Sequence, residues 1–158
     1  PEGTIYELCP GAAATVYEVA GRLKEQGGAA LFIDYGHDSP RDGSTLQAVR
    51  AHRKVDPFAA PGEADITAHV DFSAIALAAQ DAGFDVLGYT SQAHFLVNSG
   101  LLPLVDAARA RADWAAVAAA QRLVAEHEMG ELFKVLALHH GAFWDAIGFR
   151  TGDRTHTL

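Results

Sequence analysis

The apolar positions in the first part of the chain change from a helical period to a continuous run. Four apolar residues recur at helical spacing before the helix stop at Gly27-Gly28, namely Val16, Val19, Ala20 and Leu23. In residues 29–35, odd-numbered and even-numbered positions both carry apolar side chains. This pattern predicts a parallel-sheet strand that is buried on both faces. With a short strand predicted at residues 4–8, this region is interpreted as a β-α-β unit.

Further along, the pattern alternates between helices and strands. Asp71 is predicted to cap a helix over residues 72–82, because its side chain can accept hydrogen bonds from the first turn. Residues 44–49 suggest a helical turn, and residues 52–68 lack a clean period and contain Pro57 and Pro61, which indicates an irregular excursion over the sheet edge. The remaining predicted elements are strands at residues 85–90 and 132–140, helices at 91–98, 102–111 and 114–126, and polar turns at 141–158.

Composition and charge narrow the class of protein. The chain has 158 residues, 49% hydrophobic and 20% charged, as expected for a single soluble domain over residues 1–158. Its formal net charge of −8 disfavours broad binding to nucleic acid or to an anionic membrane surface. Cys9 is the only cysteine, so a reducing compartment is expected. No apolar run approaches the roughly 20 residues of a membrane-spanning helix.

Polar residues able to do chemistry gather after the predicted strand at residues 29–35. Asp34, Tyr35 and His37 lie at its carboxyl end, where open parallel sheets bind their ligands. The later segment APGEADITAHVDF adds five candidates, Glu63, Asp65, Thr67, His69 and Asp71. The carboxylates and imidazoles that could suit a metal ion are Asp34, His37, His52, Asp65, His69 and Asp71. Their spacing matches no compact ligand motif, so no metal site is predicted. A GxSxG elbow and glycine-rich phosphate loops are absent from the sequence.

Longer stretches of the sequence resemble a known family. GGAALFIDYGH, APGEADITAHVDF, SQAHFLVNSGL and EMGELFKVLAL are similar to the downstream half of the MidA-like family, over roughly residues 7–138. These are class I S-adenosylmethionine-dependent methyltransferases, related to the mitochondrial complex I assembly methyltransferase. The resemblance implies an α/β fold, the C-terminal half of a Rossmann-like class I methyltransferase sheet. Residues 29–35 would be its fifth strand, 85–90 the sixth and 132–139 an antiparallel seventh, with residues 91–127 as an inserted helical cap.

The resemblance also implies a chemistry. It implies methyl transfer from S-adenosyl-L-methionine to a protein, at an arginine of a respiratory-complex subunit or its bacterial counterpart. Carboxylates must hold the arginine, because a guanidinium is charged near neutral pH. The predicted catalytic residues are Asp34, Asp65 and His69, and the predicted substrate-binding residues are Tyr35, His37, Glu63, Thr67 and Asp71. The family's glycine-rich cofactor loop is expected upstream of Pro1, so the chain is interpreted as the distal part of a longer protein.

Two other functions stay open on the residues alone. The helical segment carries Phe95, Leu96, Leu101, Leu102 and Trp114, which could hold a partner in a non-catalytic protein-binding or assembly module. A metal-dependent hydrolase is the third hypothesis. We expect a protein substrate, no binding to nucleic acid and no membrane insertion. A homodimer stays open as an oligomeric state. The expected location is the cytoplasm for a bacterial protein and the mitochondrial matrix for a eukaryotic one.

Overall fold

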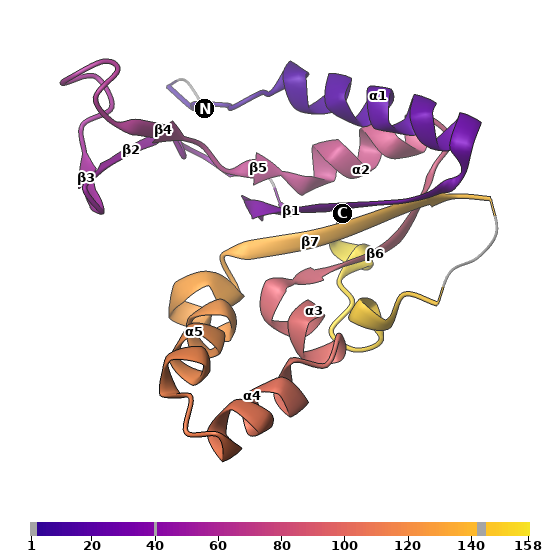
Figure 1. The fold of residues 1–158 in the computed structure, drawn as a ribbon. Helices are drawn as coiled ribbons and strands as arrows, with labels where there is room; N and C mark the ends of the chain where they lie inside the picture. Colours follow the sequence, from indigo (N-terminus) through magenta and orange to yellow (C-terminus); the bar gives the residue numbers. More distant parts are fainter. Residues whose placement is uncertain (1–2, 40, 142–144) are drawn as a thin grey trace.

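The computed structural model describes residues 3–39, 41–141 and 145–158, and its centre is a four-stranded mixed sheet (Figure 1). The strand order is β5 (Val70–Asp71), β1 (Gly28–His37), β7 (Phe133–His140) and β6 (Asp85–Ser91). β7 runs antiparallel to both β1 and β6, while β5 is parallel to β1. The antiparallel orientation predicted for this strand is therefore confirmed, and the structure places the strand between β1 and β6.

Two helices cover one face of this sheet. α1 (Pro10–Gln26) begins with a proline in its first turn, and α2 (Phe72–Asp81) is capped by Asp71. Their apolar sides pack on the even-numbered side chains of β7, so that Leu136 and Leu138 are almost completely buried. The ring of Phe72 lies 5.6 Å from that of Tyr89 and closes the core beneath α2.

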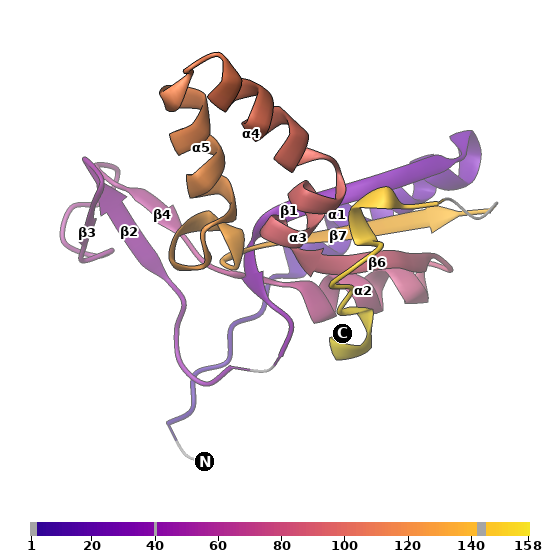
Figure 2. The ribbon, with the colours of Figure 1, turned by 90° about the horizontal axis from the view of Figure 1, so that it is seen from below.

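The opposite face carries a helical segment and the beginning of the C-terminal segment (Figure 2). The helical segment consists of α3 (Gln92–Asn98), α4 (Leu101–Ala110), α5 (Trp114–Val124) and the π-turn η1 (Glu126–Gly130). The C-terminal segment contains two short 3-10 turns, η2 (Ile147–Phe149) and η3 (Thr155–Thr157). Phe149 packs with Val135 and Ala137 of β7 to form a second, smaller core.

A small antiparallel sheet extends beyond the carboxyl end of β1 (Figure 1). Its strands are β2 (Gln47–Arg50), β3 (Arg53–Val55) and β4 (Asp65–Thr67), in the order β3-β2-β4. The prediction of a helical turn at residues 44–49 is therefore wrong, and the segment predicted to be irregular contains two strands. Ala51 and His52 turn the chain between β2 and β3 with φ of 49° and 61°. Because such turns usually carry glycine or asparagine, no hairpin signal was visible at these positions.

Two further predictions are corrected. Residues 4–8 form no strand, because they run to the pocket described below instead of joining the sheet. β1 is not buried on both faces: Leu31 and Ile33 are 47% and 49% exposed, and its outer edge pairs with β5 only at Gly36 and His37. Among the described residues, none of the helices has the length and apolar character needed to cross a membrane.

Candidate functional site

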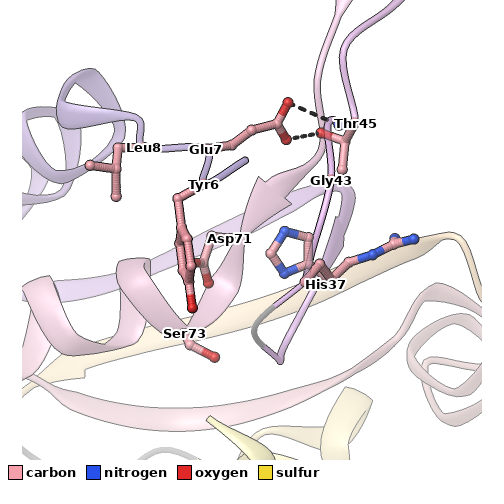
Figure 3. A pocket seen from close by; sticks show the side chains of 9 residues that line it. Tyr6, Glu7, Leu8, His37, Gly43, Thr45, Asp71 and Ser73 are labelled. Carbon is pink, nitrogen blue, oxygen red and sulfur yellow. Dashed lines mark hydrogen bonds between the residues drawn. The ribbon is translucent and has the colours of Figure 1, made fainter. Parts of the chain in front are cut away.

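The carboxyl end of β1 borders a pocket of about 190 Å³, where the N-terminal segment meets the start of α2 (Figure 3). Its lining comes from three separate stretches of the chain, within residues 6–8, 37–45 and 71–73: Tyr6, Glu7, Leu8, His37, Arg41, Gly43, Thr45, Asp71 and Ser73. The two carboxylates outnumber the single guanidinium, of Arg41, so the lining has an excess of negative charge. The position at the carboxyl end of a strand agrees with the site predicted from the sequence.

Glu7 fixes one wall of the pocket. Its Oε1 accepts hydrogen bonds from the Ser44 hydroxyl at 2.8 Å and the Thr45 N–H at 2.9 Å, and its Oε2 accepts one from the Thr45 hydroxyl. Hydrogen bonds from the side chains of Thr45 and Ser44 lower the pKa of Glu7 from 4.5 to about 2. The Thr45 hydroxyl in turn accepts a bond from the His69 N–H at 2.9 Å. Glu7 therefore connects three distant segments as a carboxylate that is ionised at neutral pH.

Asp71 serves both as a helix cap and as part of the pocket lining. Its Oδ1 accepts the N–H of Ala74 at 3.1 Å, which confirms the predicted cap of α2. Its other oxygen, Oδ2, accepts no hydrogen bond within the described parts of the chain. The carboxylate is exposed and lines the pocket, so this oxygen can receive a ligand.

Two histidines and a tyrosine lie around the end of β1. The Tyr35 ring stands edge-on to His69, with centroids 5.8 Å apart, while His37 lines the pocket itself. In both histidines Nδ1 is buried and has no hydrogen-bond partner among the described residues. Burial, together with the positive charge of Arg41 and the neighbouring His37, lowers the pKa of His69. His69 is therefore neutral near pH 7.

The other predicted residues do not line this pocket. Asp34 is half-buried on β1, and its Oδ1 accepts the N–H of Tyr35 at 2.8 Å. Glu63 forms an exposed ion pair with Arg50 at 2.8 Å. Asp65 and Thr67 lie on β4, where they pair with β2 in the small sheet. The structure thus brings together His37 and Asp71 at the pocket, with His69 joined to its wall.

Several pocket residues were missed, chiefly Tyr6, Glu7, Thr45 and Ser73. A signal existed for Glu7, because the predicted strand at residues 4–8 would have placed it at a carboxyl end, as for Asp34. Thr45 and Ser73 had no such signal, since nothing local distinguishes them from other loop and helix hydroxyls. In the described ranges, no three His, Cys, Asp or Glu side chains gather in a way that could hold a metal ion.

Comparison with known proteins begins with a sequence family. The model of the family described as "Putative S-adenosyl-L-methionine-dependent methyltransferase" matches residues 1–90, more than half of the chain. The match includes the whole N-terminal segment, β1, the small sheet and α2. Every residue that lines the pocket therefore lies inside the matched region.

Curated relatives match more than half of the chain. The mitochondrial protein arginine methyltransferase NDUFAF7 of Mus musculus is 38% identical over 137 residues, which cover 84% of this chain and 31% of the relative. The Danio rerio protein of the same name is 42% identical over 95 residues, 60% of this chain and 22% of the relative. The chain thus spans less than a third of the length of these relatives.

Two solved structures from Burkholderia thailandensis have the same architecture. A native crystal structure superimposes with a TM-score of 0.85 and 45% identity, covering 94% of this chain and 42% of that one. A second structure, bound to S-adenosyl-homocysteine, gives a TM-score of 0.82 and 45% identity, covering 92% of this chain and 40% of that one. The likeness extends over nearly all of the present chain.

Proposed function

Because this chain belongs to the MidA-like family of class I S-adenosyl-L-methionine-dependent methyltransferases, we propose that its protein methylates an arginine side chain of a protein substrate. The names of the mitochondrial relatives, protein arginine methyltransferases, support this substrate. The complete protein is proposed to act in the mitochondrial matrix if it is eukaryotic, with a complex I subunit as its target, and in the cytoplasm if it is bacterial.

The pocket at the end of β1 is the observation that carries the proposal. Its volume of about 190 Å³ is below the roughly 300–1,000 Å³ of pockets that enclose a whole drug-sized ligand. We therefore assign it to the end of an acceptor side chain rather than to the cofactor. A planar guanidinium suits it, because carboxylates bind that group through charge-assisted hydrogen bonds.

The two carboxylates have different roles in this proposal. Both oxygens of Glu7 are already occupied by Ser44 and Thr45, so Glu7 positions the wall and supplies negative charge. Asp71 has one oxygen available and binds the guanidinium directly, which orients one nitrogen for reaction. The Tyr6 ring lines the same pocket as Asp71 and would flank the acceptor (Figure 3).

S-adenosyl-L-methionine supplies an electrophilic methyl group when it is bound. The guanidinium nitrogen that receives the methyl group must lose a proton, and His37 lines the same pocket as Asp71. We assign the uptake of that proton to His37, with Asp71 holding the acceptor in place. The sequence-based assignments of Asp34, Asp65 and His69 to catalysis stay predictions, and the same assay tests them.

The test measures transfer of labelled methyl groups from S-adenosyl-L-methionine by the complete protein. Arginine-containing peptides are compared with the same peptides carrying lysine, and label is expected on arginine. Asp71→Asn should lower kcat/KM at least about tenfold while keeping the fold, because asparagine caps helices as well as aspartate. Asp85→Asn, an exposed carboxylate at the start of β6, is the matched control. Equal labelling of lysine peptides, or full activity of Asp71→Asn, would contradict the proposal.

A second candidate function rests on the helical segment. Leu102, Leu104 and Trp114 are 55%, 67% and 65% exposed on α4 and α5, which favours a protein-binding or assembly module. This function predicts that Leu104→Ser abolishes copurification with the physiological partner, whereas Asp71→Asn leaves it intact. Loss of partner binding with Asp71→Asn alone would argue for the enzyme.

A further inference from the structure

The C-terminal segment, residues 145–158, is bound along β6 by three hydrogen bonds, one of which joins two main-chain groups. The Arg154 N–H donates to the carbonyl of Tyr89 at 2.6 Å, and the Tyr89 N–H donates to Oδ1 of Asp153 at 3.1 Å. The Thr90 hydroxyl donates to the Gly152 carbonyl at 2.6 Å. The segment therefore occupies the outer edge of the sheet, as Figure 2 shows in yellow beside β6.

The beginning of this segment packs closely against β6 and α3. Phe149 lies on Gly88, where an added Cβ would stand 2.3 Å from its ring. Gly148 faces the ring of Phe95 in the same way, again at 2.3 Å. Asn98 donates to the carbonyls of Gly148 and Thr151, at 3.1 Å and 2.9 Å. Small residues are therefore needed on both sides of the contact.

An ion-pair network joins the middle of the segment to the site end of the sheet. Arg154 donates to Glu131 through its two terminal guanidinium nitrogens, Nη1 and Nη2. Lys134 donates to the same carboxylate at 3.1 Å. Burial alone would raise the pKa of Glu131, but the bonds from Arg154 and Lys134 outweigh it and lower that pKa. Lys134 is only 9% exposed, so removing Arg154 would leave a partly buried cluster one cation short.

The last residues reach the turn that follows β1. The Thr157 hydroxyl lies 3.0 Å from Oδ2 of Asp38 and 2.8 Å from the Arg154 carbonyl, so its one proton is shared between these two acceptors. The Ser73 hydroxyl donates to the Asp38 carbonyl at 3.0 Å. Asp38 follows His37 in the sequence, and His37 and Ser73 both line the pocket. Burial and the nearby Asp38 carboxylate raise the pKa of Tyr89, so this tyrosine is a neutral neighbour of the turn. Leu158 packs against the main core.

We propose that the C-terminal segment is a strap that positions the His37–Asp38 turn, with Arg154 and Thr157 as its positioning residues. Arg154 fixes the strap against Glu131, and Thr157 contacts Asp38. The turn is thereby held by Ser73, which lines the pocket, and by the strap, whose positioning residues do not line it. The effect of the strap on methyl transfer rests on the proposed function, whereas its effect on the turn does not.

Hydrogen–deuterium exchange on the complete protein tests the strap directly. Thr157→Val and Arg154→Gln should each speed exchange in peptides that contain the Asp38 turn by about tenfold, as expected from losing a hydrogen bond to a charged group. Matched controls lie in the same strap: Thr155→Val loses only a local bond to Asp153, and Arg150→Gln loses only an exposed ion pair. Neither control should change exchange at the turn, and thermal denaturation verifies that every variant is folded.

Kinetics then separate the strap from the proposed function. In Thr157→Val, KM for the arginine acceptor should rise several-fold while KM for S-adenosyl-L-methionine is unchanged, because only the acceptor pocket is loosened. Unchanged exchange at the turn in both positioning variants would overturn the strap. If wild-type protein transfers no methyl group although the variants loosen the turn, the strap stands and the proposed function fails.

Discussion

Gly88→Ala tests the contact between β6 and Phe149 in isolation. The new Cβ would lie 2.3 Å from Cγ, 2.6 Å from Cδ1 and 2.8 Å from Cβ of Phe149, whereas ordinary contacts begin at 3.4 Å. The ring must therefore retreat by about 1.1 Å, the difference between 3.4 and 2.3 Å, away from Val135 and Ala137. Phe149 cannot rotate out of the way alone, because its own Cβ is among the clashing atoms.

Overpacking of this kind costs roughly 1–3 kcal/mol. For a chain of this size each kcal/mol lowers the melting temperature by about 2–4 °C, so the melting temperature should fall by roughly 2–12 °C. Thermal denaturation followed by circular dichroism measures the change. Gly21→Ala is the control: it lies in α1 with nothing within 4 Å of the added Cβ, and it should stabilise by about 0.5–1 kcal/mol.

A double-mutant cycle identifies the cause of the destabilisation. Phe149→Ala removes the ring, so Gly88→Ala should cost almost nothing in that background. If Gly88→Ala is neutral in the wild-type background, or costs as much in the Phe149→Ala background as in the wild type, the steric reasoning is refuted.

Two further predictions concern the site end of the sheet. Because the pKa of Glu7 is about 2 in the folded protein and 4.5 ordinarily, its stabilisation is complete above about pH 4.5 and is lost as the pH falls toward 2. Glu7→Gln should therefore cost about 1 kcal/mol near neutral pH, a small value for an exposed group, and the difference from wild type in urea denaturation should vanish near pH 2. Gly36→Ala would place a Cβ 2.2 Å from the carbonyl oxygen of Val70, a backbone atom, so a loss of about 3 kcal/mol in the same assay is expected, with separation of β5 from β1. Stability within about 0.5 kcal/mol of wild type, the usual scatter of harmless substitutions, would contradict the second prediction, and a pH-independent difference would contradict the first.

The sequence predicted the elements whose signal is local. The family and the class I methyltransferase sheet are confirmed, as are α1, α2, β6, β7 and the helices α3, α4 and α5. However, the strand that is buried on both faces is β7 and not β1, because six consecutive residues of β7, from Lys134 to His139, are buried. An apolar run alone could not distinguish a central strand from one whose face stays open.

The site was predicted only in part, because its members meet through tertiary structure. His37 and Asp71 carried local signals, a strand end and a helix cap. Glu7 meets Thr45 across 38 positions of sequence, and Thr157 meets Asp38 across 119. No period or motif encodes such pairings, so the strap in particular could not be distinguished from a tail of polar turns.

β7 follows β1, β5 and β6 in sequence but lies between β1 and β6 in space, which determines when these strands can pair during synthesis. β1 and β6 both pair with β7 and not with each other. Until Phe133–His140 has been made, β1 and β6 share no hydrogen-bonded partner, and α1 and α2 can cover them from one side only. In the nascent chain, β1 and β6 must therefore stay unpaired with each other until β7 inserts between them. Long-range pairing of this kind makes folding slow and favours assembly after, rather than during, translation of the segment.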